Sequence, residues 1–122
     1  PDNPKLNLPL MFDPGERWQY SSGIDWAGTV MEAITGKKLG VYLKEAIFDP
    51  LGMDSTGFAR TDSMYERMAH LHHRQADGTL VAQDLGPNNP PRIERGGGGL
   101  HSTVGDYMTF TLELRRRRRW GR

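Results

Sequence analysis

Residues 14–35 constrain the fold most, because they combine a turn, a short extended run and the start of an amphipathic helix. Pro14-Gly15 is a turn dipeptide, since proline fixes φ and glycine accepts positive φ. The run of residues 17–20 is too short and too rich in aromatic residues for a helix, and it predicts the end of a strand. Ser22 and Asp25 then have capping-box spacing. We therefore expect a helix to begin at Ser22.

The predicted helix over residues 22–35 has one apolar stripe, because its apolar residues recur at three- and four-residue intervals. This stripe consists of Ile24, Ala27, Val30, Met31 and Ile34. Gly36 stands where a glycine ends a helix. Further helices are predicted over 39–48, 61–68 and 103–114, with a β-hairpin near 68–82. The expected fold class is α+β, mostly helical.

Particular residues mark the expected boundaries and turn of these segments. Pro50 should stop the second helix, because the residue before a proline is disfavoured in the helical region. Thr103 and Asp106 have capping-box spacing at the start of the last helix. Its expected buried face consists of Tyr107, Phe110 and Leu114. The hairpin should turn at Asp77-Gly78.

Tyr20 lies where the extended run meets the predicted helix N-terminus. A phenol at that place is near free N–H donors and the positive end of a helix dipole, which favours its ionised form. The alternative is that Tyr20 and Trp18 are aromatic residues of a core, and local chemistry alone favours this alternative.

Composition excludes several classes of protein. The formal net charge is only +1, which argues against a generally basic nucleic-acid binder. There is no cysteine, so disulfides and thiolate metal sites are excluded. The chain shows no signal-peptide pattern and no apolar run of the roughly 20 residues that a membrane span needs. We therefore expect no membrane partner, and the cytoplasm is slightly favoured.

Two clusters have alternative interpretations. His70, His72 and His73 invite a metal site with Asp77 as a further ligand, but surface histidines on a hairpin fit better, because a metal needs more ligands. The glycine run 96–99 lacks the phosphate-binding patterns, and indicates that the backbone passes close to a ligand or another strand. We predict no metal and no cofactor.

The arginine run 115–119 could contact phosphates, but a solvated or non-native tail fits its place after a helix better. No serine starts a Ser-x-x-Lys motif, and no Gly-x-Ser-x-Gly elbow occurs. The chain thus lacks a recognisable activated nucleophile of its own.

Three segments in order carry a resemblance to a known family. Residues 14–22 match a "PG…(W/F)-x-Tyr-Ser-Asn" segment, and residues 34–58 match "i-x-G…i-f-x-PLGM-x-x-T-x-F". Residues 97–106 are similar to a "GGL-x-ST-x-x-D" loop and helix. Together they resemble the serine β-lactamase and penicillin-binding-protein-like superfamily, in its class C, esterase and acyltransferase branch. The resemblance covers about residues 8–112.

This resemblance implies that a Ser-x-x-Lys serine attacks an ester or amide carbonyl and forms an acyl-enzyme. It makes Tyr20 the catalytic tyrosine that handles the proton, and assigns Ser22, Gly97 and Gly98 to substrate binding. Ser22 replaces the asparagine of the motif and offers no amide donor, which favours ester or thioester substrates.

The resemblance also implies what this sequence lacks. Residues 1–114 would form a partial β-lactamase/transpeptidase-like domain without the Ser-x-x-Lys and C-terminal strand motifs, with 115–122 as a tail. We expect such a fragment to be inactive alone, and to self-associate through exposed apolar faces. A non-catalytic helical interaction module and a nucleic-acid binder acting through the arginine tail are the alternatives.

Overall fold

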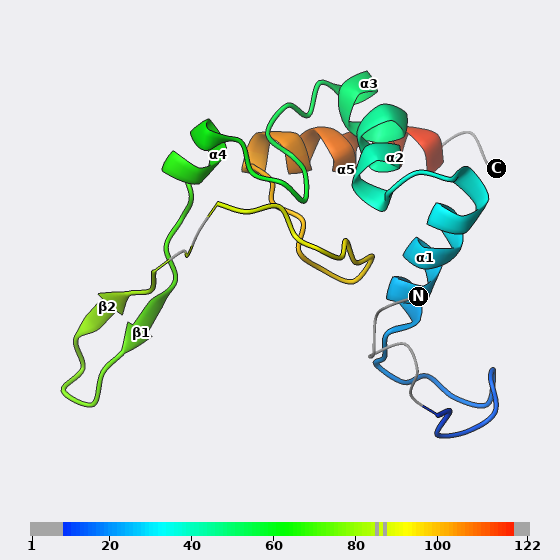
Figure 1. The fold of residues 1–122 in the computed structure, drawn as a ribbon, viewed down its shortest axis with the longest axis horizontal. Helices are drawn as coiled ribbons and strands as arrows, with labels where there is room; N and C mark the ends of the chain where they lie inside the picture. Colours follow the sequence, from blue (N-terminus) through cyan, green and yellow to red (C-terminus); the bar gives the residue numbers. More distant parts are fainter. Residues whose placement is uncertain (1–8, 85, 87, 119–122) are drawn as a thin grey trace.

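The computed structural model describes residues 9–84, 86 and 88–118, which form a mostly helical chain with one small antiparallel sheet (Figure 1). The helical elements are α1 (Gly23–Thr35), α2 (Leu39–Leu43), the π-helical turn η2 (Lys44–Phe48), α3 (Asp49–Leu51), α4 (Asp62–Glu66) and α5 (Val104–Arg118). The strands are β1 (His72–Arg74) and β2 (Leu80–Ala82). The predicted α+β class is confirmed. The ends of the predicted domain and tail, residues 1–8 and 119–122, lie outside the described residues.

Helix α1 begins and ends where the sequence predicts, but its first turn is not a capping box. The side chain of Ser22 makes no capping bond, and the Gly23 N–H donates instead to Ser21 Oγ at 3.3 Å. The Asp25 carboxylate accepts from a distant backbone N–H described below. At the other end, Gly36 adopts a left-handed conformation with φ of 67°, and its N–H donates to the Glu32 carbonyl.

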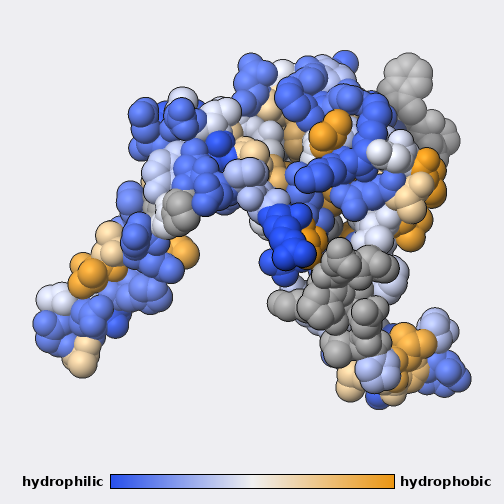
Figure 2. Space-filling model, in the orientation of Figure 1, coloured by the Kyte–Doolittle hydropathy of each residue, from blue (hydrophilic) through white to orange (hydrophobic). Residues whose placement is uncertain are grey.

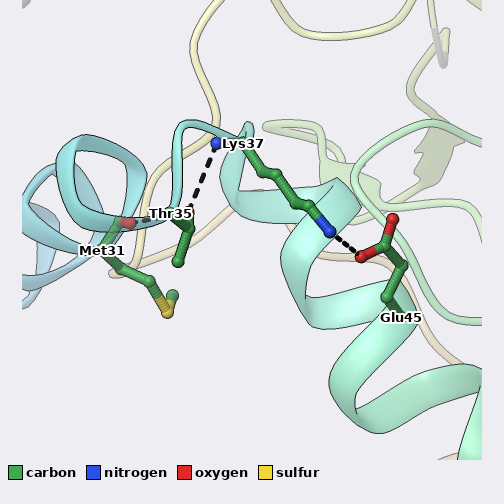
Figure 3. Close-up of polar contacts among 4 residues, drawn as sticks. All are labelled: Met31, Thr35, Lys37 and Glu45. Atoms are coloured by element: carbon green, nitrogen blue, oxygen red, sulfur yellow. Dashed lines mark hydrogen bonds and ion pairs between the residues drawn. The ribbon is translucent and has the colours of Figure 1, made fainter.

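The connection from α1 to α2 is held by local polar contacts (Figure 3). The Thr35 hydroxyl donates to the Met31 carbonyl at 2.8 Å, and accepts from the Lys37 N–H at 3.3 Å. The Lys37 ammonium pairs with the Glu45 carboxylate, across to η2. Both ion-pair partners are about half exposed, so the pair orients the turn more than it stabilises the fold.

Pro50 does not stop the second helix, contrary to the sequence prediction. The helical path continues through η2 and α3 and ends at Gly52, while Asp49 stays right-handed helical with φ of −62°. The Asp49 N–H donates to the Lys44 carbonyl, five residues back. Such a wide turn relieves the clash between a proline ring and the carbonyl of the preceding turn, so the helix tolerates Pro50.

The core is small and is formed by residues of the segment 39–58. Four apolar residues of the described chain are buried, with 3–6% of their surface exposed: Leu39, Phe48, Met53 and Phe58. They come from α2, η2 and the loop after α3. Helix α1 contributes the backbone of Gly28, where an added Cβ would lie 3.1 Å from Leu39 Cδ2.

The remaining apolar side chains are largely exposed. Figure 2 shows hydrophobic side chains on the surface over α1 and on the hairpin. On α5 the prediction of a buried face is wrong for Tyr107 and Leu114, which are 62% and 46% exposed, whereas Phe110 is half-buried. The described part of α5 also runs four residues past the predicted end at Leu114, to Arg118.

The predicted hairpin and short helix are both present. Strands β1 and β2 pair antiparallel with His73 opposite Val81, and both strands are exposed. Helix α4 begins at the Thr61 side chain, which accepts from the Met64 N–H at 3.2 Å. Among the described residues, no helix has the length and apolar character needed to cross a membrane.

Candidate functional site

The segment before α1 is a turn followed by irregular chain. The Pro14-Gly15 turn forms as predicted, closed by a 3.3 Å hydrogen bond from the Glu16 N–H to the Asp13 carbonyl. The strand predicted for residues 17–20 is absent. The physical reason is that a strand needs a neighbour to accept its backbone hydrogen bonds, and no described residue pairs with this run.

Tyr20 lies at the end of this run and faces solvent. Its exposed fraction is 84%, and that of Trp18 is 83%, so the alternative that they are core aromatics is wrong for this structure. Among the described residues, no hydrogen bond to the Tyr20 hydroxyl is present. The phenol is therefore accessible to a reacting group from outside this chain segment.

Ser22 stands at the N-cap position of α1, two residues after Tyr20. It is half-buried, and its hydroxyl caps no backbone group of the helix. The Ser22 carbonyl accepts the first helical bonds, from the Asp25 and Trp26 N–H groups at 3.0 and 3.1 Å. The hydroxyl thus remains available for a ligand next to Tyr20, as the assignment to substrate binding requires.

The glycine run packs against the first turn of α1. The Gly97 N–H donates to Asp25 Oδ1 at 2.8 Å, across 72 residues of sequence. A Cβ on Gly96 would lie 2.3 Å from the Ile24 carbonyl oxygen, a distance that no side chain tolerates. The run therefore approaches a helix, and neither of the neighbours that the sequence suggested, a strand or a ligand, is needed to explain it.

Gly97 and Gly98, the two glycines assigned to the site, differ in how tightly they are packed. A Cβ on Gly97 would touch Ile24 Cγ2 at 3.0 Å, whereas one on Gly98 would meet nothing within 4 Å. Gly98 instead closes a tight bridge with Arg95, through its N–H and the Arg95 carbonyl at 3.4 Å. Gly97 is thus fixed on α1 and Gly98 lies in open space.

Two carboxylates that the sequence reasoning missed bind the first turn of α2: Glu94 joins it to the glycine loop, and Glu32 joins it to α1. Glu94 Oε2 accepts from the Gly40 N–H at 2.6 Å, and Glu32 Oε1 accepts from the Leu39 N–H at 2.8 Å. Both N–H groups belong to the first turn of α2, where free donors and the helix dipole favour negative charge. The only signal for Glu94 in the sequence is its place just before the glycine run.

The structure therefore brings the glycine loop to the helix turn that Ser22 begins and Tyr20 precedes. Asp25 and Glu94 fix the loop from two sides, on α1 and α2. Of the predicted site residues, Tyr20, Ser22 and Gly97 belong to or contact this one end of α1, and Gly98 follows in the loop. The arrangement offers an exposed phenol, a hydroxyl and glycine backbone without side chains beside a helix N-terminus.

The histidines of the hairpin, His70, His72 and His73, do not come together as a metal site would require. The His72 ring nitrogen Nδ1 is 3.1 Å from the His70 carbonyl, and His73 Nε2 is 3.1 Å from Gln83 Oε1. Within the described ranges, no group of three potential ligands lies together.

Comparisons with known proteins give one consistent result. A family model described as Beta-lactamase matches residues 6–120. Monacolin J acid methylbutanoyltransferase of Aspergillus terreus is 36% identical over 117 residues, which cover 93% of this chain and 28% of that protein. Lovastatin esterase of Penicillium rubens is 38% identical over 127 residues, covering 93% of this chain and 32% of the esterase.

A solved structure agrees with these relatives. A mutant of simvastatin synthase (LovD) from Aspergillus terreus superimposes with a TM-score of 0.77 at 37% identity, over 88% of this chain and 27% of that one. The chain thus spans about a third or less of the length of these curated relatives and of that structure.

Proposed function

The chain belongs to the beta-lactamase family, and from this membership we propose that it is part of a serine hydrolase or acyltransferase that works through an acyl-enzyme. The relatives named above include a methylbutanoyltransferase and an esterase, so the proposed substrates are small molecules with an ester, thioester or amide carbonyl. The observation that carries the proposal is the place of Tyr20, exposed directly before the N-terminus of α1 with the glycine loop held on the same helix turn.

In the proposed reaction, the Oγ of a Ser-x-x-Lys serine forms a bond to the substrate carbonyl carbon. Tyr20 takes the hydroxyl proton of this nucleophile and returns a proton to the leaving alcohol, thiol or amine. Water or an acceptor alcohol then attacks the acyl-enzyme, and the same phenol handles the proton again. The serine and its lysine are absent from these 122 residues, so the proposal assigns them to sequence beyond this chain.

Ser22 and the glycine loop would bind the substrate rather than react with it. The Ser22 hydroxyl can donate one hydrogen bond and accept others, but it has no amide donor. This chemistry favours esters and thioesters over β-lactams. Backbone groups of Gly97 and Gly98 can approach a substrate closely, because no side chain intervenes.

We propose that the 122-residue chain alone is inactive. In a p-nitrophenyl butyrate assay, we expect it to release p-nitrophenol no faster than buffer does. Hydrolysis by the purified chain that disappears in Tyr20→Phe would overturn this part of the proposal, because it would require a nucleophile within these residues.

The role of Tyr20 is tested in a longer chain, once the flanking coding sequence has been read for an in-frame Ser-x-x-Lys. There we expect Tyr20→Phe to lower kcat by about 10²- to 10⁴-fold, the usual contribution of a positioned acid–base group, with KM little changed. Tyr107→Phe on α5 is the matched control, since it removes another exposed phenol. Equal kcat in both variants would refute the role.

A second candidate function is a non-catalytic helical interaction module. The supporting observation is the exposed apolar surface of α1, where Ile24, Val30 and Ile34 are 52–80% exposed. Under this alternative, the flanking sequence holds no Ser-x-x-Lys motif, and Tyr20→Phe leaves every measured property unchanged.

A further inference from the structure

A cavity of about 470 Å³ lies between α4 and the start of α5. Its volume is in the range of small-molecule sites. The lining described by the structure includes none of the four proposed site residues, so the cavity is a separate feature. Its polar walls come from Ser55, Arg60, Arg67, His101, Ser102 and Thr103.

Arg67 supplies a positive charge that no carboxylate balances among the described residues. Its Nε donates to the Ser63 carbonyl at 3.1 Å and to Ser63 Oγ at 3.3 Å, and its Nη2 reaches Ser55 Oγ at 3.4 Å. All three acceptors are neutral oxygens. Hydrogen bonds from a guanidinium to an anion are about twice as strong, so an anion at this position gains over the present partners.

Arg60 and His101 also line the cavity. Arg60 lies 5.1 Å from the Tyr65 ring centroid and donates to Met68 Sδ at 3.4 Å. Burial, together with the charge of Arg60, lowers the pKa of His101 below its usual value of 6.5. The lowered pKa favours the neutral imidazole of His101, so Arg60 and Arg67 are the cationic side chains of the described lining.

The start of α5 adds to the positive charge of the two arginines. Thr103 and Val104 line the cavity at the N-terminus of a 15-residue helix, where backbone N–H groups and the dipole favour negative charge. The acidic residue of this turn, Asp106, is already engaged: its Oδ2 accepts from the Ser55 N–H at 2.9 Å and from the Thr56 hydroxyl at 2.7 Å. No carboxylate is among the described lining residues.

The rest of the wall is apolar. Met64 and Met68 come from α4 and the residues after it, and Leu100 and Val104 come from the segment that enters α5. Methionine side chains adapt to ligands of different shape. The cavity therefore combines cationic donors with a hydrocarbon wall.

We propose that this cavity binds an aliphatic carboxylic acid, with its carboxylate at Arg67 and its hydrocarbon chain along Met64, Met68 and Leu100. The site is independent of the proposed acyl transfer, since it uses none of Tyr20, Ser22 or the glycine loop.

The test is an NMR titration of the 122-residue chain with octanoate below its micellar concentration, and with acetate and octanol as partial ligands. We expect octanoate to shift the amide signals of Leu100 to Val104 saturably and to bind more tightly than either partial ligand. The carboxylate beside His101 should also raise the pKa of its imidazole, read from the ring C–H signals. If octanol binds as tightly as octanoate, the proposed carboxylate contact at Arg67 is wrong. If acetate binds as tightly as octanoate, the proposed contact of the hydrocarbon chain with the apolar wall is wrong.

Variants locate the carboxylate. Arg67→Gln should weaken octanoate binding by about tenfold, as loss of a hydrogen bond from a charged group does, and Arg67→Lys should have an intermediate effect. Arg92→Gln is the matched control, because Arg92 is exposed and outside the cavity lining. Arg67 is itself exposed, so its substitution should leave the circular dichroism spectrum unchanged. Equal octanoate affinity in Arg67→Gln and Arg92→Gln would refute the site.

Discussion

The segment 39–58 and helix α1 have similar apolar patterns, yet only the first is packed. The four apolar side chains that are buried among the described residues all lie in 39–58, with exposed fractions of 3–6%. On α1, Ile24, Val30 and Ile34 are 58%, 52% and 80% exposed. Apolar spacing therefore determines that a helix forms and which face is apolar, whereas burial depends on what lies opposite that face.

The segment 39–58 is packed because the chain returns onto it. Beyond α3, Met53 and Phe58 fold back toward Leu39 and Phe48, and the loop between them is fastened to α5 by the Asp106 carboxylate. A backbone bridge between Gly57 and His101, with N–H···O distances of 3.0 and 2.9 Å, joins the same two parts. Within the described part of the chain, α1 meets Leu39 at Gly28 and the glycine loop at Ile24 and Asp25.

The largest difference between the two regions should be seen on truncating a side chain in each. Phe48→Ala removes a 5%-exposed ring from the core, and we expect it to lower the free energy of unfolding by about 3–5 kcal/mol. Val30→Ala on α1 should change it by about 0.5 kcal/mol or less, since half of that side chain is already in water. Urea denaturation followed by circular dichroism measures both. Equal losses would show that α1 is buried in solution.

A smaller effect is expected from two aspartates that make the same pair of hydrogen bonds. Asp106 accepts from the Ser55 N–H and the Thr56 hydroxyl, half-buried and across about 50 residues of sequence. Asp77 accepts from the Thr79 N–H and hydroxyl, at 2.9 and 2.7 Å, within the exposed hairpin turn. We expect Asp106→Ala to cost about 2 kcal/mol, because it leaves the half-buried Ser55 N–H without its acceptor and removes a charged acceptor from the Thr56 hydroxyl, which keeps only Ser102 Oγ at 2.8 Å. Asp77→Ala should leave the midpoint of global unfolding unchanged.

The effect of Asp77 should instead be local and dependent on pH. The two Thr79 hydrogen bonds hold the pKa of Asp77 below its usual value of 3.8. A lowered folded pKa means that the contribution is complete above about pH 3.8, and is lost as the pH falls through the folded pKa. Protection of the Thr79 amide from hydrogen exchange should decline over that range, and should be absent in Asp77→Ala. Thr79 amide protection that does not change after Asp77 is protonated would contradict the view that the Asp77 carboxylate holds this turn.

The sequence predicts the local elements of this fold well and its long-range contacts poorly. The α1 bounds and the hairpin that turns at Asp77-Gly78 are set by residues close in the chain, and they are confirmed. The Ser22–Asp25 capping box is wrong because Asp25 bonds to Gly97, and the stop at Pro50 is wrong because a π-helical turn precedes it. Neither cause is visible within a few residues of the error.

The same distinction holds for the candidate site. Tyr20, Ser22 and the glycines are recognised from short motifs, and their approach to one end of α1 fits that recognition. Glu94 is missed, because its role depends on Gly40, 54 residues away. The strand predicted for 17–20 fails for a related reason, since its aromatic residues show β propensity while no described residue pairs with them.

The smallest effect on stability should come from a substitution on the exposed face of α1. The same substitution tests whether this face is exposed in solution or covered by a second copy of the chain. The accessible surface of the chain is 10102 Å², against roughly 6,600 Å² for a compact chain of its 13.8 kDa mass. If this excess drives self-association through α1, Ile34→Glu should shift the sedimentation of concentrated chain to that of a monomer. Because Ile34 is 80% exposed, the free energy of unfolding at low protein concentration should change by about 0.5 kcal/mol or less. Thr109→Glu on the exposed face of α5 is the control, and should leave association intact. Sedimentation of the unmodified chain as a monomer at every concentration would show that the α1 face is not an interface between copies, and would leave it for a partner of different sequence.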